Sequence, residues 1–189
     1  MLSEYPSKNT ANKLQQLASY NDWKRGVSGH SGIPFGDWAD VVVEYCTNGF
    51  TGLEDMAARN DRVTFVLGLL SVMDSLSALN TTEKILINSY DQFMRNENDG
   101  NKIIGTLNLI AMSQKTRHLK SKNIFEVREF MHRFLETSIS AASAGTTFCA
   151  LRFYGDSSSL PIIRGYPPMP DCWEEARKSA LSIIRKKYV

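Results

Sequence analysis

The segment 61–79, DRVTFVLGLLSVMDSLSAL, constrains the fold more than any other part of the chain. Its apolar side chains recur at steps of three and four residues, a spacing that places them on one helical face: Val63, Val66, Leu67, Leu70, Met73 and Leu76. Further apolar residues widen this face until little polar surface remains: Phe65, Leu69, Val72 and Leu79. Asp61 is placed to cap the helix and Asn80 to end it. The segment therefore predicts a central helix that is buried among neighbours on several sides.

The remaining sequence predicts an all-α, single-domain bundle of about seven helices over residues 1–189, with no internal repeat. Helix starts are indicated by capping patterns at Thr51–Glu54, Asn80–Glu83, Asn123–Glu126 and Asp171. Besides the central helix and a short one that leads into it from Thr51, the expected helices span residues 9–23, 37–46, 80–94, 102–115, 121–144 and 171–187. Two segments fit a strand as well as a helix, namely residues 41–43 and 146–155.

The expected irregular segments are a flexible N-terminal arm (1–8), a glycine-rich loop after residue 23, a turn over 96–101 and a Pro-rich loop (155–170) before the last helix. Hydrophobic residues make up 42% and charged residues 22% of the chain, proportions that are ordinary for a soluble globular protein. The longest apolar run, residues 65–70, is too short to span a bilayer, so no membrane association is expected.

Three cysteines at wide spacing (Cys46, Cys149 and Cys172) do not form a disulfide framework, and each lies next to apolar residues, as small buried side chains do. The N-terminus lacks the basic-then-apolar pattern of a signal peptide. Both features predict a cytoplasmic protein, or a virion protein if the chain is viral.

Charge is distributed unevenly along the chain. Residues 1–114 hold 9 Lys and Arg against 13 Asp and Glu, whereas residues 115–189 hold 13 against 7. The split favours either a basic surface for an anionic partner or an acidic patch on one subunit that meets a basic patch on the next. Chance clustering on solvated faces is the alternative.

The positive residues of the second half form a candidate phosphate-binding set: Lys115, Arg117, Lys120, Lys122, Arg128, Arg133, Arg152 and Arg164. Phosphate contacts need only Lys and Arg on one accessible face, so this density is typical of sequence-independent nucleic-acid binding. Tyr154 and Tyr166 lie beside two of the arginines and could stack on bases. The competing interpretation is a solvated helical face with paired charges.

Metal, cofactor and catalytic signatures are weak. The histidines (His30, His118 and His132) have no partner at helical ligand spacing, and His132 is expected on the polar side of its helix. The segment 29–32, GHSG, places a Ser beside a His, but Ile33 stands where a nucleophile elbow needs glycine. No phosphate-binding glycine motif occurs. We therefore expect no metal, no cofactor and no enzyme; catalysis would need a polar pocket that unites His30 or His118 with a carboxylate or cysteine.

A second partner motif lies in the Pro-rich loop. Arg164, Pro167 and Pro170 match the basic-x-x-Pro-x-x-Pro pattern that SH3 domains bind as a polyproline II helix. In a compact protein, such a segment also serves to brace the start of the following helix.

The residues Trp38-Ala39-Asp40 followed by Cys46-Thr47-Asn48 resemble a stretch near the start of tobamovirus coat proteins. Those proteins are rod-forming viral subunits built on a helical bundle. The match covers residues 38–48, and the gap between its halves is shorter here than in that family. The helical segments and basic second half are similar in character to coat and nucleocapsid proteins of helical RNA viruses. The resemblance implies a viral structural protein, and it transfers no RNA-contacting residue to this chain.

The leading hypothesis from the sequence is thus a non-enzymatic, self-assembling, RNA-binding protein of coat or nucleocapsid type. It would contact RNA phosphates without sequence preference and associate with copies of itself. The alternative is an all-α protein-interaction module, such as an adaptor, regulator or host-directed effector, with no nucleic-acid role.

Overall fold

The computed structural model describes residues 35–188 apart from 74, 113–120 and 138. Within this part of the chain, every regular element is a helix, so the all-α prediction is confirmed. The helices are α2 (Phe35–Ala58), α3 (Val63–Val72), α4 (Leu76–Asn88), α5 (Tyr90–Arg95), α6 (Glu97–Met112), α7 (Ile124–Glu136), α8 (Ala141–Tyr154), α9 (Ser159–Gly165) and α10 (Asp171–Tyr188). The predicted N-terminal arm, the helix over 9–23 and the glycine-rich loop lie outside the described residues, apart from the end of that loop.

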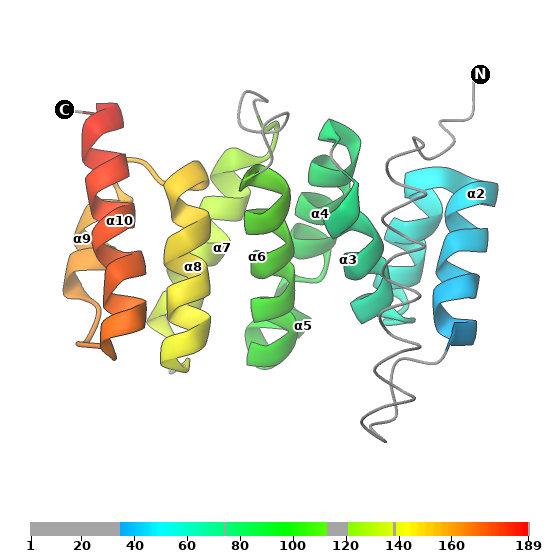
Figure 1. Cartoon of the computed structure of the whole chain (residues 1–189), viewed down its shortest axis with the longest axis horizontal. Coiled ribbons are helices and arrows are strands. Elements are labelled where there is room, and N and C mark those ends of the chain that lie inside the picture. The colour runs from blue at the N-terminus through cyan, green and yellow to red at the C-terminus, as the bar shows by residue number, and fades with distance from the viewer. Residues whose placement is uncertain (1–34, 74, 113–120, 138, 189) are drawn as a thin grey trace.

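The helices form a row two layers deep (Figure 1). One layer contains α3, α6, α8 and α10 side by side, and the other contains α4, α7 and α9. Helix α2 stands at one end of the row and α10 at the other. The core lies between the layers, where four phenylalanine side chains are fully buried: Phe93, Phe130, Phe134 and Phe148. Burial of the facing apolar sides of both layers drives this arrangement.

The predicted central helix over 61–79 is wrong as a single element. It is divided into α3 and the first turn of α4, because Met73 takes an extended backbone conformation and Ser75 caps α4. The Ser75 hydroxyl accepts a hydrogen bond from the backbone N–H of Ala78 at 3.1 Å. Asn80 therefore lies inside α4 and does not end a helix. The buried character is confirmed, since Val66, Leu69 and Leu70 are fully inaccessible, and the apolar run reflects two consecutive buried helices.

The predicted helix over 121–144 is likewise two elements, α7 and α8, joined at residues 137–140. Ser140 caps α8 through Ser143, and the carboxylate of Glu97 accepts hydrogen bonds from both hydroxyls at 2.6 Å. These hydrogen bonds, together with one from the Ser140 N–H, hold the pKa of Glu97 below its ordinary value. A serine cap with a carboxylate partner from another helix is enough to start a new helix inside an apolar stretch.

Other boundaries also differ from the prediction. The segment 155–170 is not one loop, because Ser159–Gly165 forms α9, and the ambiguous residues 41–43 and 146–154 are helical. The expected turn over 96–101 is mostly the first turn of α6. The predicted separation of 37–46 from the Thr51 helix is confirmed, because α2 consists of two helical segments that are divided at Gly49, where φ is +65°. The last helix begins at Asp171 as predicted.

Gly145 lies inside α8 against the indole ring of Trp173 from α10. A Cβ atom at this position would overlap the ring. Gly145→Ala should lower the free energy of unfolding by about 1–3 kcal/mol, as overpacked cores do. Gly105→Ala is the matched control, since its Cβ would lie 3.7 Å from Thr146 and should be neutral or stabilising. Urea unfolding measures both; equal effects would contradict the close α8–α10 contact.

Candidate nucleic-acid interface

The C-terminal ends of α6, α8 and α10 lie at the same edge of the row, and α7 begins there (Figure 1). This follows from the chain order, because α6, α8 and α10 run in the same direction while α7 returns between them. Helix C-termini carry partial negative charge, which favours Lys and Arg in the last turns. Among the positive residues at these helix ends, four form what we call the basic edge: Lys122, Arg152, Lys186 and Lys187.

The members of the basic edge differ in how they are held. Lys187 donates a hydrogen bond at 2.7 Å to the backbone carbonyl of Arg152 and so ties the end of α10 to the end of α8. Burial of its ammonium group lowers the pKa of Lys187. The guanidinium of Arg152 donates to the carbonyl of Cys149 at 3.0 Å and lies over the Phe153 ring. Lys122 and Lys186 are exposed to solvent, Lys187 is exposed over most of its side chain, and Arg152 is half-buried.

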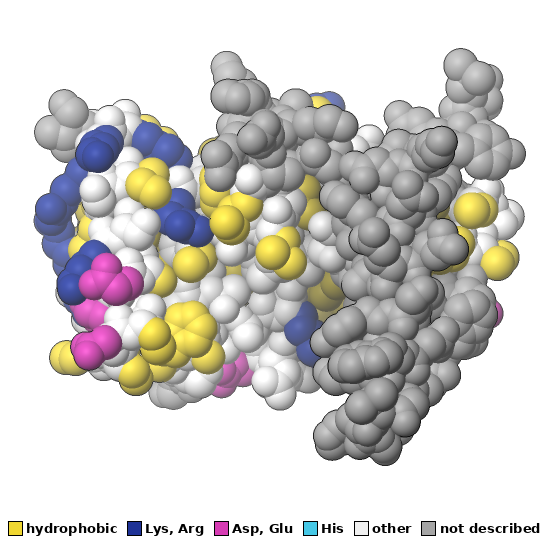
Figure 2. Space-filling model, viewed as in Figure 1, with side chains coloured by type: hydrophobic (Ala, Val, Ile, Leu, Met, Phe, Trp, Pro, Cys, Tyr) yellow, Lys and Arg dark blue, Asp and Glu magenta, His cyan; other side chains and the backbone are white. Residues whose placement is uncertain are grey.

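Charge is segregated along α10. Its first turn carries Asp171 and Glu174, and its last turn carries Arg185, Lys186 and Lys187. Figure 2 shows Lys and Arg side chains gathered over α10 and the neighbouring end of α8, with Asp and Glu side chains at the opposite end of α10. No acidic residue occurs in α10 after Glu175. The basic edge is therefore a positively charged surface that accessible phosphates could neutralise.

The other predicted phosphate-binding residues are not brought into one strip. Lys115, Arg117 and Lys120 lie outside the described residues. Arg128 is mostly buried and forms an ion pair with Asp156 at 2.7 Å. Arg133 is exposed and donates to the hydroxyl of Tyr90 at 3.1 Å, which raises its pKa. Arg164 is exposed on α9, in the layer opposite Arg152. The two tyrosines predicted to stack on bases also differ, since Tyr154 is buried while Tyr166 is partly exposed.

The SH3-type motif is divided between two conformations. Arg164 lies in the last turn of α9, whereas Pro167 and Pro170 lie in the non-helical link that follows. Both prolines are exposed, but the arginine does not continue the same extended segment. The carbonyl of Pro170 accepts hydrogen bonds from Trp173 and Glu174, so this end of the link braces the start of α10.

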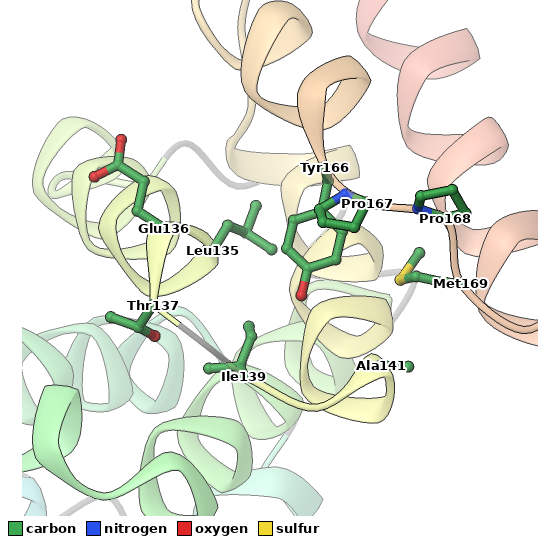
Figure 3. A pocket seen from close by; sticks show the side chains of 9 residues that line it. All are labelled: Leu135, Glu136, Thr137, Ile139, Ala141, Tyr166, Pro167, Pro168 and Met169. Atoms are coloured by element: carbon green, nitrogen blue, oxygen red, sulfur yellow. The ribbon is translucent and has the colours of Figure 1, made fainter.

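The link between α9 and α10 also forms one wall of a cavity of about 390 Å³ (Figure 3). Tyr166, Pro167, Pro168 and Met169 face a second wall from the α7–α8 junction: Leu135, Glu136, Thr137, Ile139 and Ala141. Figure 3 shows the carboxyl group of Glu136 pointing away from Tyr166. The two ionisable groups therefore do not form an acid–base pair across the cavity.

A Ser–His–Glu cluster joins α7 to α9, and sequence reasoning missed it. His132 was expected to be solvated, but its side chain is only 7% exposed because α9 covers this side of α7. Its Nε2 lies 2.8 Å from the Ser159 hydroxyl, and its Nδ1 lies 3.6 Å from the Glu129 carboxylate. This order of groups is that of a hydrolase triad. Ser159 is completely inaccessible, however, so a substrate cannot reach it, and the cluster acts as a buried link between helices.

Burial lowers the pKa of His132, and the charges of Glu129, Arg128, Asp156 and Glu136 act on it as well. The folded state therefore holds the imidazole neutral to a lower pH than the unfolded state, whose pKa is about 6.5. Stability should be unaffected by this group above that value and should fall as the pH drops below it. His132→Gln should flatten the dependence of the urea midpoint between pH 7.5 and 5; an unchanged slope would contradict the assignment.

All three cysteines are free thiols. Cys46 and Cys172 are exposed and Cys149 is half-buried, so the prediction that all three are buried is wrong. In the described part of the chain, no cluster of three or more His, Cys, Asp or Glu side chains could hold a metal ion. A search of the same residues finds no helix with the length and hydrophobicity needed to cross a membrane.

Comparison with known proteins finds no protein-family model, no curated protein and no solved structure that matches this chain.

Proposed function

We propose that this protein is a non-enzymatic, self-assembling RNA-binding protein of the structural kind, which contacts RNA phosphates through the basic edge. The observation that carries the proposal is the edge of the row where α8 and α10 end and α7 begins: Lys187 is tied there to the carbonyl of Arg152, Lys186 precedes it in the last turn of α10, and Lys122 directly precedes α7.

The surface supports phosphate contacts better than base readout. Lys and Arg bind phosphate oxygens without reading sequence, and a specific code would need polar side chains directed at base edges. Three of the four members of the basic edge are exposed, namely Lys122, Lys186 and Lys187. Binding should therefore be tolerant of RNA sequence and sensitive to ionic strength.

Charge reversal at two exposed members tests the proposal. Lys122→Glu together with Lys186→Glu should weaken binding of a single-stranded RNA oligonucleotide. It should also reduce the slope of log K against log salt by about 1.4, or about 0.7 for each lost phosphate contact. Fluorescence anisotropy with a labelled oligouridylate across a salt series measures both quantities.

The matched control is Arg59→Glu together with Arg95→Glu, which makes the same change in net charge at two exposed positions away from the basic edge. This variant should keep most of the wild-type slope. If both double variants reduced the slope equally, binding would depend on net charge alone and the basic edge would not be the interface.

A further inference from the structure

Exposed apolar side chains collect at the same edge of the row as the basic edge. Six large apolar side chains are exposed among the described residues, and only Val43, in α2, lies away from this edge. The other five belong to the last turn of α6, the first turn of α7 and the last turn of α10: Leu109, Met112, Ile124, Phe125 and Tyr188. Figure 1 shows these helix ends at one edge. Single exposed apolar residues are ordinary, but a group of them among positive charges indicates a binding surface.

Side-chain contacts connect apolar and positive residues where α6, α8 and α10 end. The guanidinium of Arg152 lies 4.0 Å from the sulfur of Met112 and 5.8 Å from the centroid of the Phe153 ring. Lys187 donates to the carbonyls of Arg152 and Phe153 at 2.7 and 3.5 Å. Tyr188, the next residue, is 53% exposed. The ends of these three helices therefore present cations and apolar groups as one connected surface.

Phe125 adds an exposed aromatic ring at the start of α7. It is 59% exposed, and the guanidinium of Arg128 lies over its ring, 5.6 Å from the centroid. Arg128 is held in turn by Asp156 at 2.7 Å, so the cation on this face of the ring has a fixed position. A flat group can therefore lie against the remaining face of Phe125. Lys122 stands three residues before it and is exposed, where it can contact a phosphate of the same ligand.

We propose that Phe125 and Tyr188 stack on unpaired bases, so that the basic edge selects single-stranded over double-stranded RNA. The inference rests on the proposed function, because it concerns the bases of the same RNA whose phosphates the basic edge contacts. In a duplex the bases are stacked on one another, whereas the bases of a single strand can be splayed out onto aromatic side chains. Every base has a flat π-face, so this stacking adds affinity without reading sequence.

A membrane surface is the competing ligand for a positive edge with exposed apolar residues. Helices that bind membranes lie flat in the interface and bury one long apolar face, whereas these apolar residues stand at helix ends. The last turn of a helix has carbonyl groups that depend on water or on caps, and end-on insertion into lipid would remove that water. A nucleic-acid strand leaves it in place. The arrangement therefore favours single-stranded RNA.

Strand preference tests the inference in the full chain. At one salt concentration, fluorescence anisotropy compares labelled oligouridylate with an RNA duplex that has the same number of phosphates. Phosphate contacts alone favour the duplex, because its charge density is higher. The wild type should nevertheless bind oligouridylate at least about tenfold more tightly, since two bases stack on aromatic rings. A duplex that binds as tightly as the single strand would overturn the inference.

Single substitutions identify the stacking side chains. Phe125→Ala and Tyr188→Ala should each weaken oligouridylate binding about fivefold or more and leave duplex binding unchanged. Phe125→Trp should retain single-strand binding, and Val43→Ala is the matched control, because it truncates an exposed apolar side chain away from this edge. Circular dichroism establishes that each variant is folded. Equal single-strand affinity in the wild type and both alanine variants would contradict the assignment.

Failure of this inference is distinguishable from failure of the proposed function. None of these substitutions removes a positive charge, so the salt dependence should keep its wild-type slope. Salt-dependent binding without a strand preference would leave the basic edge in place and overturn the stacking, whereas salt-independent binding would contradict the basic edge and the stacking with it. Sedimentation with vesicles of phosphatidylserine and phosphatidylcholine tests the membrane alternative: vesicle binding that Phe125→Ala abolishes would overturn the inference.

Discussion

Phe148→Ala should reduce the free energy of unfolding by about 3–5 kcal/mol, the range for truncating a large buried aromatic side chain. Phe148 is fully inaccessible in α8, which packs against α6, α7 and α10. Its ring also meets that of Tyr166 edge-to-face, with centroids 5.4 Å apart. Truncation would therefore leave a cavity in the helix that joins the two layers and would remove a contact to the α9–α10 link.

Urea unfolding followed by circular dichroism measures the effect. Phe125→Ala is the control, because Phe125 is 59% exposed and contacts Arg128 through its ring face at 5.6 Å. Its loss should cost less than about 1 kcal/mol. Similar losses for the two variants would show that α8 is not the centre of the packing.

Glu83→Ala should have an effect of comparable size for a different reason. Glu83 is completely buried in α4, where one carboxyl oxygen accepts from the Tyr154 hydroxyl at 2.8 Å and the other from the Asn123 amide at 3.1 Å. Removing the acceptor leaves two donors without a partner, each at a cost of about 1–3 kcal/mol. We therefore expect a loss of roughly 2–6 kcal/mol.

Two measurements distinguish the loss of the Glu83 hydrogen-bond network from the loss of buried side-chain volume. Tyr154→Phe in the Glu83→Ala background should cost less than in the wild type, and a double-mutant cycle gives the coupling. Burial and the nearby Glu83 raise the pKa of Tyr154 well above its ordinary value. The stability that this tyrosine contributes should be complete below pH ~10 and should be lost as the pH rises further. Additive losses in the cycle would contradict the network.

The helices that form the two layers could be predicted because their apolar residues recur at helical spacing. The apolar residues of 121–144 recur at helical spacing, which predicts one inward-facing stripe; Val127, Phe130 and Phe134 in that stripe are buried, whereas Ile124 at its start is exposed. Helix α10 also begins at the predicted residue, where Asp171 follows Pro170. In both cases the sequence pattern that predicts the structure lies within a few turns of one helix.

Breaks inside apolar runs could not be located from the sequence. The cap at Ser140 depends on Glu97, which is 43 residues away, and the extended conformation at Met73 has no distinctive local signature. Ser75 and Ser140 are the residue types that cap helices, but serine is common, and only the tertiary contacts distinguish these two.

The candidate site was only partly predictable for the same reason. Arg128 and Arg152 look equivalent in the sequence, yet one is held by Asp156 and the other stands at a helix end with Lys187 nearby. His132 lies on the side of α7 that appears polar, but Ser159 from α9 covers it. Charge density in a sequence indicates a basic protein surface, whereas the division of charges between ion pairs and open surface is set by the packing of helices.

The most direct test of the account is the salt dependence of RNA binding by the unmodified chain. With the four described residues of the basic edge contacting phosphates, log K should fall linearly with log salt with a slope of about −3 for a single-stranded oligonucleotide. Oligouridylate and oligocytidylate should give the same slope within error. A slope near zero, or binding to one sequence alone, would contradict phosphate contact through the basic edge.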